Sequence, residues 1–120
     1  MRGRVIGLVV AGAAIAALLL LFRPPVEHDL VVRLGAQSAR VREVDLHFLR
    51  DGATERDLTL SFPEPAPAEV RRAIKLRRGR YDVAARIVLR DGREAHVGRV
   101  FDPAVDETID LEDATAASGR

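Results

Sequence analysis

Three histidines are the residues of this chain best suited to acid–base chemistry or to binding a transition metal. His28, His47 and His96 are too far apart in sequence for the i, i+2 or i, i+4 spacing of a metal-binding pair. Cysteine is absent, which excludes thiolate ligands, cysteine nucleophiles and disulfides. His47 alternates with Leu46 and Phe48 on the polar side of a strand pattern. We therefore interpret the three histidines as solvated side chains and expect no catalytic residue, no metal site and no cofactor.

Serine hydrolysis and calcium binding are the other chemistries that the residue types allow. The three serines lie outside a Gly-x-Ser-x-Gly context, so nucleophilic hydrolysis has no basis in the sequence. Acidic residues crowd the C-terminal end, but they lack the Asp-x-Asp-x-Asp-Gly series of a calcium loop. Their alternation with apolar residues predicts that most of them lie on a solvated face. The serines are Ser38, Ser61 and Ser118, and the acidic residues are Asp106, Glu107, Asp110, Glu112 and Asp113.

A basic run is the most unusual feature of the predicted surface, because residues 71–80 carry six cationic side chains. The run could pair with the acidic segment 102–113 across neighbouring strands, contact anionic lipid or polysaccharide, or dock a protein. Pairing within the chain is the favoured interpretation, because the domain as a whole is slightly acidic. The candidate interaction patch consists of Arg71, Arg72, Lys75, Arg77, Arg78 and Arg80.

The overall charge does not indicate a nucleic-acid binder. The chain has 19 basic and 18 acidic side chains. Without Arg2, Arg4 and Arg23 the balance becomes 16 basic against 18 acidic, a net charge of −2. Aromatic residues make up 4% of the chain and tryptophan is absent, which argues against a stacking platform for sugars or single strands. We expect no nucleic-acid partner and no small-molecule substrate.

The N-terminal residues predict a membrane anchor. Residues 5–22, VIGLVVAGAAIAALLLLF, carry no charge, and as a helix they would extend about 27 Å, close to the thickness of the hydrocarbon core. Arg2 and Arg4 precede this run, and Arg23 with two prolines ends it. The positive-inside rule then places residues 1–4 in the cytoplasm and the rest of the chain outside it.

A cleaved signal peptide is the alternative for the same residues, because Ala14-Ile15-Ala16 has the small-x-small form of a cleavage site. Cleavage there would leave six apolar residues at the new terminus, so an uncleaved signal anchor is favoured. Arginine outnumbers lysine 18 to 1, which indicates a GC-rich bacterial genome. The expected location is the bacterial cytoplasmic (inner) membrane, with the C-terminal domain in the periplasm or cell exterior.

The remaining chain has the pattern of short strands. Apolar residues alternate with polar ones around Leu30, Val44, Leu58, Val83 and Val97, and again in residues 108–111. Residues 50–52 and 90–92 both read Arg-Asp-Gly between such segments, which predicts two hairpins. Length alone limits the chain to one domain. The prediction is an all-β fold, a seven-stranded antiparallel β-sandwich preceded by a single transmembrane helix.

Residues 69–78 are the ambiguous element. Pro67, Glu69 and Gly79 would suit the start and the end of a short helix, whereas the alternation of Ile74 and Leu76 with polar residues favours a strand. We predict a strand, which completes two layers. The expected organisation is a linker over 23–28, a sandwich over 29–112 and a flexible tail over 113–120.

Residues 74–111 resemble the second half of carboxypeptidase-regulatory-like and transthyretin-like domains, which are immunoglobulin-like β-sandwiches. The resemblance rests on Leu76, Gly79 and Tyr81, followed by an alternating strand from Val83. It implies a sandwich fold and a noncatalytic role in structure or adhesion.

The sequence thus predicts a membrane-anchored extracytoplasmic sandwich that binds protein and catalyses nothing. Its partners would be the bilayer, through residues 5–22, and a protein of the membrane or periplasm, as in an accessory subunit of a membrane complex. The alternative is an exported ligand-binding or enzymatic domain that uses His47, His96 and the C-terminal acidic residues. That alternative requires these side chains to converge in one pocket.

Overall fold

The computed structural model describes residues 24–118, and these contain seven strands and two short helices. The prediction for residues 5–22 lies outside them. The strands are β1 (Val26–Arg33), β2 (Val41–Arg50), β3 (Ala53–Ser61), β4 (Glu69–Leu76), β5 (Tyr81–Leu89), β6 (Glu94–Phe101) and β7 (Thr108–Asp110). The helices are the 3-10 helix η1 (Gly35–Arg40) and the α-helix α2 (Glu112–Ser118).

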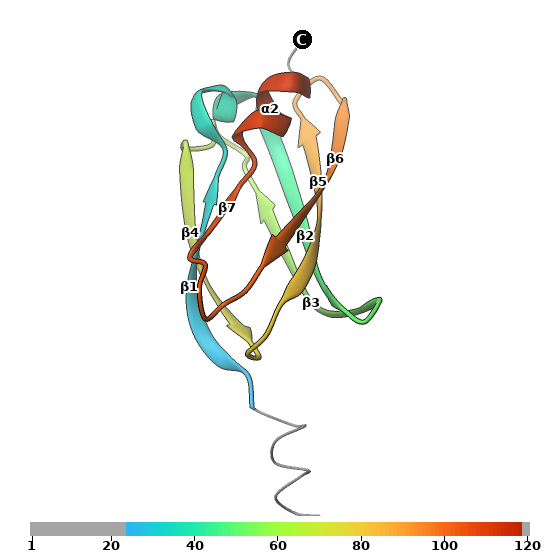
Figure 1. Ribbon diagram of the computed structural model, residues 1–120. Helices are drawn as coiled ribbons and strands as arrows, with labels where there is room; N and C mark the ends of the chain where they lie inside the picture. The colour runs from blue at the N-terminus through green and yellow to red at the C-terminus, as the bar shows by residue number, and fades with distance from the viewer. Residues whose placement is uncertain (1–23, 119–120) are drawn as a thin grey trace, which may run out of the picture.

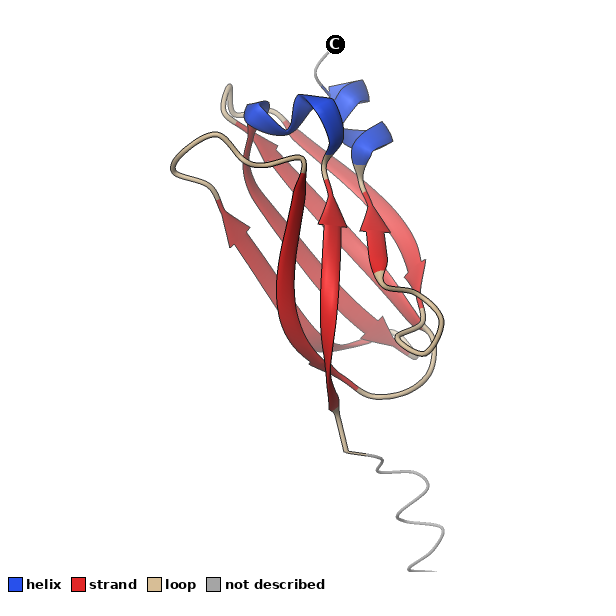
Figure 2. Ribbon diagram, turned by 90° about the vertical axis from the view of Figure 1, so that its left-hand side faces the viewer, coloured by secondary structure: helices blue, strands red, loops and turns tan. Residues whose placement is uncertain are grey.

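The strands form two sheets that face each other. One sheet has the order β4-β1-β7 and the other β3-β2-β5-β6. The three-stranded sheet lies in front of the four-stranded sheet in Figure 2, and Figure 1 shows η1 and α2 together at one end of the layers. This arrangement confirms the prediction of an all-β, two-layered fold.

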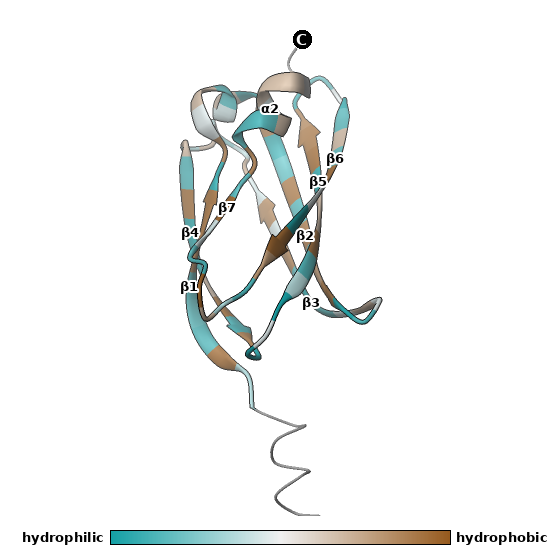
Figure 3. Cartoon of the chain, viewed as in Figure 1, coloured by the Kyte–Doolittle hydropathy of each residue, from teal (hydrophilic) through white to brown (hydrophobic). Residues whose placement is uncertain are grey.

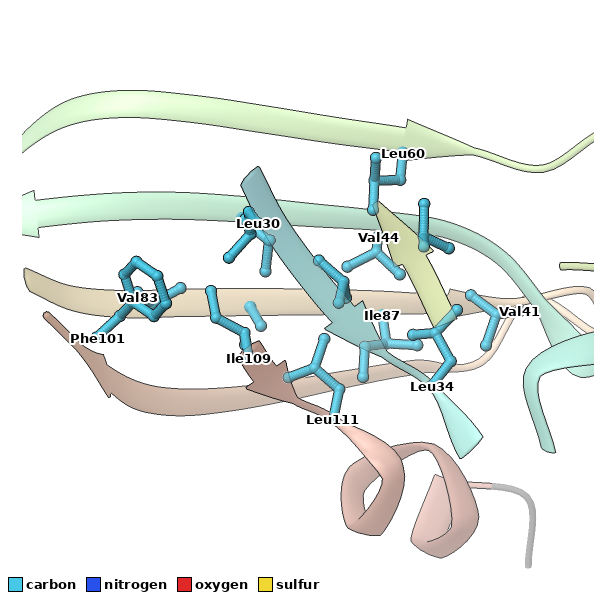
Figure 4. Close-up of a cluster of buried hydrophobic side chains, with 14 of the residues drawn as sticks. Leu30, Leu34, Val41, Val44, Leu60, Val83, Ile87, Phe101, Ile109 and Leu111 are labelled. Atoms are coloured by element: carbon cyan, nitrogen blue, oxygen red, sulfur yellow. The ribbon is translucent and has the colours of Figure 1, made fainter. Parts of the chain in front are cut away.

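The core fills the space between the sheets, because each strand turns alternate apolar side chains inward. Leu30 and Val32 of β1 are fully buried, and the opposite sheet contributes Phe48, Tyr81 and Phe101, each exposed by at most 1%. The ring of Phe48 meets the other two rings edge-on, with centroids 6.0 and 6.1 Å apart. Figure 4 shows side chains from both sheets meeting in this cluster, and Figure 3 shows apolar residues recurring along the strands.

Both predicted hairpins are present, and so is the strand over residues 69–78. Asp51 (φ 53°) and Gly52 (φ 79°) make the β2–β3 turn with two positive φ angles, as two-residue hairpin turns require. Gly92 has a φ of 89° in the turn between β5 and β6. β4 pairs antiparallel with β1 and buries Val70 and Ile74.

The prediction of a wholly antiparallel sandwich is wrong for one pair, since β7 runs parallel to β1. After β6, the segment 102–107 crosses to the other sheet, and its turn is closed by Asp102. The carboxylate of Asp102 accepts a hydrogen bond from the backbone N–H of Ala104 at 2.9 Å. The crossing brings β7 in beside β1 from the same end, which makes the pair parallel.

The C-terminal segment also differs from the prediction, because α2 replaces most of the expected flexible tail. Asp110 accepts a hydrogen bond from the N–H of Glu112 at 2.9 Å, and Glu112 and Asp113 occupy the first turn, where the helix dipole favours acids. The fully buried Thr115 donates its hydroxyl to the carbonyl of Leu111. The sandwich also begins earlier than expected, since β1 starts at Val26 inside the predicted linker.

Arginine side chains hold the connections at one end of the sandwich and join the two sheets at their edges, in a chain that has no disulfide. At the end that carries η1, Arg90 donates to the carbonyls of Ala39, Phe62 and Glu64 at 3.0, 3.0 and 2.6 Å. At the edges, Arg56 of β3 reaches the carbonyl of Lys75 in β4 (3.1 Å), and Arg99 of β6 reaches that of Asp110 in β7 (3.1 Å). The two edge links cross from one sheet to the other and restrict their separation.

Candidate functional site

The basic run follows edge strand β4 toward the end of the sandwich where the described chain begins. Val26, the first residue of β1, lies opposite Leu76, the last residue of β4. The turn between β4 and β5, residues 77–80, therefore lies at the N-terminal end of the domain (Figure 1). We call residues 75–80 together with Arg50, Glu55 and Arg56 the basic end.

The β4–β5 turn is held in place by Arg50 of β2. Its Nη2 donates to the carbonyl of Arg78 at 2.8 Å, and its guanidinium carbon lies 4.2 Å from the centroid of the Tyr81 ring, a cation–π contact. Gly79 has a φ of 109°, and a Cβ atom there would lie 3.2 Å from Nη2 of Arg50. The turn thus has a fixed backbone, closed over the arginine.

A second contact fixes the start of the turn. Glu55 of β3 accepts hydrogen bonds from the Arg77 guanidinium and from the Tyr81 hydroxyl, the latter at 2.7 Å. The Tyr81 oxygen in turn accepts from the Arg77 N–H at 3.0 Å. Burial acts to raise the pKa of Glu55, but the hydrogen bonds from Arg77 and Tyr81 and the charge of Arg50 outweigh it and lower the pKa. Glu55 is therefore an anion engaged by its neighbours.

The other cations of the run have no acidic partner among residues 24–118. Five of the six make no ion pair there and are exposed, and only Arg77 has a carboxylate partner. No ion pair within residues 24–118 joins these five cations to residues 102–113, the partners that the sequence favoured, although Arg71 lines one hollow with Asp106 and Glu107. The five exposed cations are Arg71, Arg72, Lys75, Arg78 and Arg80.

The acidic segment is paired elsewhere. Arg33 lies 3.1 Å from Asp110 and 2.9 Å from Glu112, and Arg99 lies 2.6 Å from Asp113. A backbone N–H and the charge of Arg99 lower the pKa of Asp113. These arginines come from β1 and β6, which flank the acidic residues, whereas β4 lies on the far side of β1. Strand order decides which charges meet, and the sequence could not show that order.

A hollow of about 310 Å³ opens beside Pro25 at the basic end. Most of its lining is polar, and three of its residues are cationic. Arg56 and Lys75, two of its lining residues, are joined by the hydrogen bond from the Arg56 side chain to the Lys75 carbonyl. The lining residues are Pro25, Glu55, Arg56, Lys75, Arg77 and Tyr81.

Two of the three histidines share the outer face of the four-stranded sheet. His47 lies opposite Ala84, Ala84 opposite Gly98, and His96 opposite Arg86, so small residues separate the imidazoles. The result is a shallow hollow of about 410 Å³. His47 Nδ1 contacts the Asp57 carboxylate. Both histidines are exposed, as predicted.

Arg86 is the centre of the charges on that face. It lies 2.9 Å from Asp45 and 2.5 Å from Glu94, and the hydrogen bonds to Glu94 and then to Asp45 raise the pKa of the guanidinium. The bond from Arg86 lowers the pKa of Glu94, which is also 3.5 Å from His96. Asp45 and Glu94 are thus engaged by an arginine, and Asp57 by His47 itself.

His28 differs from the prediction of a solvated side chain. It pairs with the buried Ile74 in the inward phase of β1 and is half-buried. Its Nε2 atom is buried and has no hydrogen-bond partner in the described part of the chain. Serine hydrolysis gains no support either, because Ser38 is buried in η1 and Ser61 lies exposed at the end of β3.

The residues of the alternative enzymatic site do not converge. The two histidines line one hollow, and Asp110, Glu112 and Asp113 line another beside Arg99. Within residues 24–118, no three acidic or histidine side chains form a group that could hold a metal ion.

Sequence analysis did not identify the structural role of three residues that organise the basic end. Arg50, Glu55 and Tyr81 come from three strands, and no spacing in the chain relates them. Arg50 lies next to the Asp-Gly turn, where a polar residue is common, so its position alone did not indicate a structural role.

A search against protein-family models, curated proteins and solved structures found no match for this chain. Among residues 24–118, the structure contains no helix with the length and apolar character needed to cross a membrane.

Proposed function

We propose that this protein is a single-pass, membrane-anchored β-sandwich that acts outside the cytoplasm as a noncatalytic protein-binding module. Residues 5–22 form the anchor in a bacterial cytoplasmic membrane, with residues 1–4 on the cytoplasmic side. The sandwich is of the immunoglobulin or transthyretin-like kind. One form of this function is an accessory subunit of a larger membrane complex.

The short connection between the apolar run and the fold is the observation that carries the proposal. The uncharged run ends at Phe22 and β1 begins at Val26. Only Arg23, Pro24 and Pro25 separate them, and even fully extended the distance from residue 22 to residue 26 is about 14 Å. A domain tethered this closely works at the membrane surface, next to whatever its anchor contacts.

The outer face of the four-stranded sheet is the surface best suited to a protein partner. Its charges are paired around Arg86, so covering them leaves few new unpaired groups. Val100 on the same face is 53% exposed, and Ala84 and Gly98 form the floor of the shallow hollow. A flat face with small central residues suits a protein surface better than a small ligand, which needs a deeper cavity.

Photo-crosslinking in native membranes tests this proposal. A photo-reactive amino acid at Ala84 of the full-length chain is expected to give one discrete adduct with a membrane or periplasmic protein. The matched position is Ala36, exposed in η1 at the end of the sandwich. Adducts at neither position, or the same unselective pattern at both, would contradict a binding role for the sheet face.

A further inference from the structure

The basic end combines three properties that suit it to binding. It carries exposed cations without acidic partners, it has a fixed backbone, and it lies where the chain leaves the sandwich toward residues 5–22. Glu27, opposite Lys75 in register, and Asp51 and Asp82 nearby leave Arg78 and Arg80 unpaired in the described part of the chain.

We infer that the basic end is a second membrane contact, at which the β4–β5 turn and the hollow beside Pro25 bind the anionic headgroups of the bilayer that residues 5–22 enter. This inference rests on the proposed function. The N-terminal end of the sandwich then contacts the membrane, and this contact restricts rotation of the domain about its short tether.

The chemistry of the hollow fits a lipid phosphate. Arg56 and Lys75 line it with cationic donors of the kind that bind phosphate oxygens, whereas the Arg77 guanidinium is held by the Glu55 carboxylate, which also lines the hollow. Nε of Arg56 is used by the Lys75 carbonyl, so its terminal nitrogens remain for a ligand. Lys75 contributes an ammonium group that has no ion-pair partner in residues 24–118.

The geometry favours a surface over a free anion or a soluble protein. Arg78 and Arg80 project from the turn outside the hollow, so the cations spread over an end of the domain and do not converge on one point. The tether, at most about 14 Å long, holds that end within reach of the headgroups at all times. Such proximity makes even weak contacts effective, because the binding is intramolecular.

The fixed turn contributes to the contact. Arg50 and Glu55 hold the backbone of residues 77–81, so binding carries no entropic cost for ordering the loop. Each basic residue near an anionic surface shifts the ratio of docked to undocked domain by about fivefold. Removing Arg78 and Arg80 should therefore lower this ratio by about 25-fold or more.

Energy transfer in reconstituted vesicles tests the inference on the full-length chain. Because the chain has no cysteine, one can be introduced at Ala53, exposed at the N-terminal end beside Arg50, and labelled with a donor dye. The acceptor is a headgroup-labelled lipid. The vesicles contain phosphatidylcholine alone or phosphatidylcholine with phosphatidylglycerol in a ratio of about two to one, which gives a surface potential large enough to attract basic side chains.

The expected result is stronger transfer in the anionic vesicles, which falls to the neutral level in about 1 M salt, where the Debye length is about 3 Å. R78E/R80E should abolish the difference and leave the thermal midpoint unchanged. The control R42E/R93E changes the charge equally at the opposite end, where R93E also removes the Arg93–Asp91 ion pair, and it should keep the difference. R78Q/R80Q should give an intermediate loss.

Two results would overturn the inference, and they have different meanings. Equal transfer in both vesicle types, or equal losses in R78E/R80E and R42E/R93E, contradicts the headgroup contact while the anchor stays intact. Release of the chain from vesicles by alkaline carbonate contradicts the anchor itself, and the inference fails with it.

Discussion

Two sets of arginines, at opposite ends of the sandwich, differ in whether they have partners. At the end with η1 and α2, Arg33 and Arg99 pair with C-terminal acids, and Arg90 donates to three carbonyls. At the basic end, Arg78 and Arg80 have no such partner among the described residues. The first set stabilises the fold, whereas the second set is free to bind something else. Variants at the two ends should therefore separate loss of stability from loss of binding.

The largest effect is expected from Leu111→Ala, between β7 and α2. Leu111 is fully buried, so truncation should lower the free energy of unfolding by about 2–5 kcal/mol, measured by denaturant titration. Val105→Ala is the control, because Val105 is 80% exposed and its loss should cost less than about 0.5 kcal/mol. Equal stability of L111A and the unmodified chain would mean that the α2 end is not packed as described.

The next largest loss of stability is expected from truncating one arginine at each end. Arg90→Ala and Arg50→Ala each remove charged donors from backbone carbonyls and should each cost about 1–3 kcal/mol. Lysine at either position should recover only part of the loss, because an ammonium group cannot reach several carbonyls at once. Thermal unfolding measures the loss of stability in both alanine variants, with R42A as the control. If R50A unfolded at the same temperature as the unmodified chain, the β4–β5 turn would not depend on this contact.

A smaller and pH-dependent effect is expected from Glu55→Gln. The pKa of Glu55 in the folded chain lies below its ordinary value of 4.5, so the carboxylate stabilises the fold above that pH. This contribution, about 1 kcal/mol, disappears as the pH falls through the lowered pKa. The stabilities of E55Q and the unmodified chain should differ near neutral pH and converge in acid. A constant difference at every pH would contradict the charged role of Glu55.

The smallest effect on stability is expected from K75Q/R80Q. Both residues are exposed and without ion pairs in the described chain, so the free energy of unfolding should change by less than about 0.5 kcal/mol. The same variant should weaken docking to anionic vesicles in the transfer experiment. A clear destabilisation would mean that these cations belong to the fold, and the difference between the two ends would be lost.

Local patterns were enough to predict the strands. Asp51-Gly52 and Asp91-Gly92 identified both hairpins, because positive φ angles leave few residue choices. Alternation at Ile74 and Leu76 correctly favoured a strand over a helix for residues 69–78. These features depend on neighbours in the chain and so can be seen in the sequence.

The remaining features depend on strand order and stagger. The parallel pairing of β7 with β1 follows from a crossing between sheets, and this decides that Arg33 and not β4 meets the C-terminal acids. The cluster of Arg50, Glu55 and Tyr81 joins residues from three strands. For α2, a local signal is present in Asp110 and the two acids after it, but the same acids also fit a solvated tail.

The most direct test of the proposed function is to determine the membrane topology of the full-length chain. A cysteine introduced at Ala36, which is exposed in η1, can be labelled with a membrane-impermeant maleimide in intact spheroplasts. Labelling without lysis is expected, on a chain that stays in the membrane pellet after alkaline carbonate. Labelling only after lysis, or release of the chain into the supernatant, would contradict the anchored, extracytoplasmic domain.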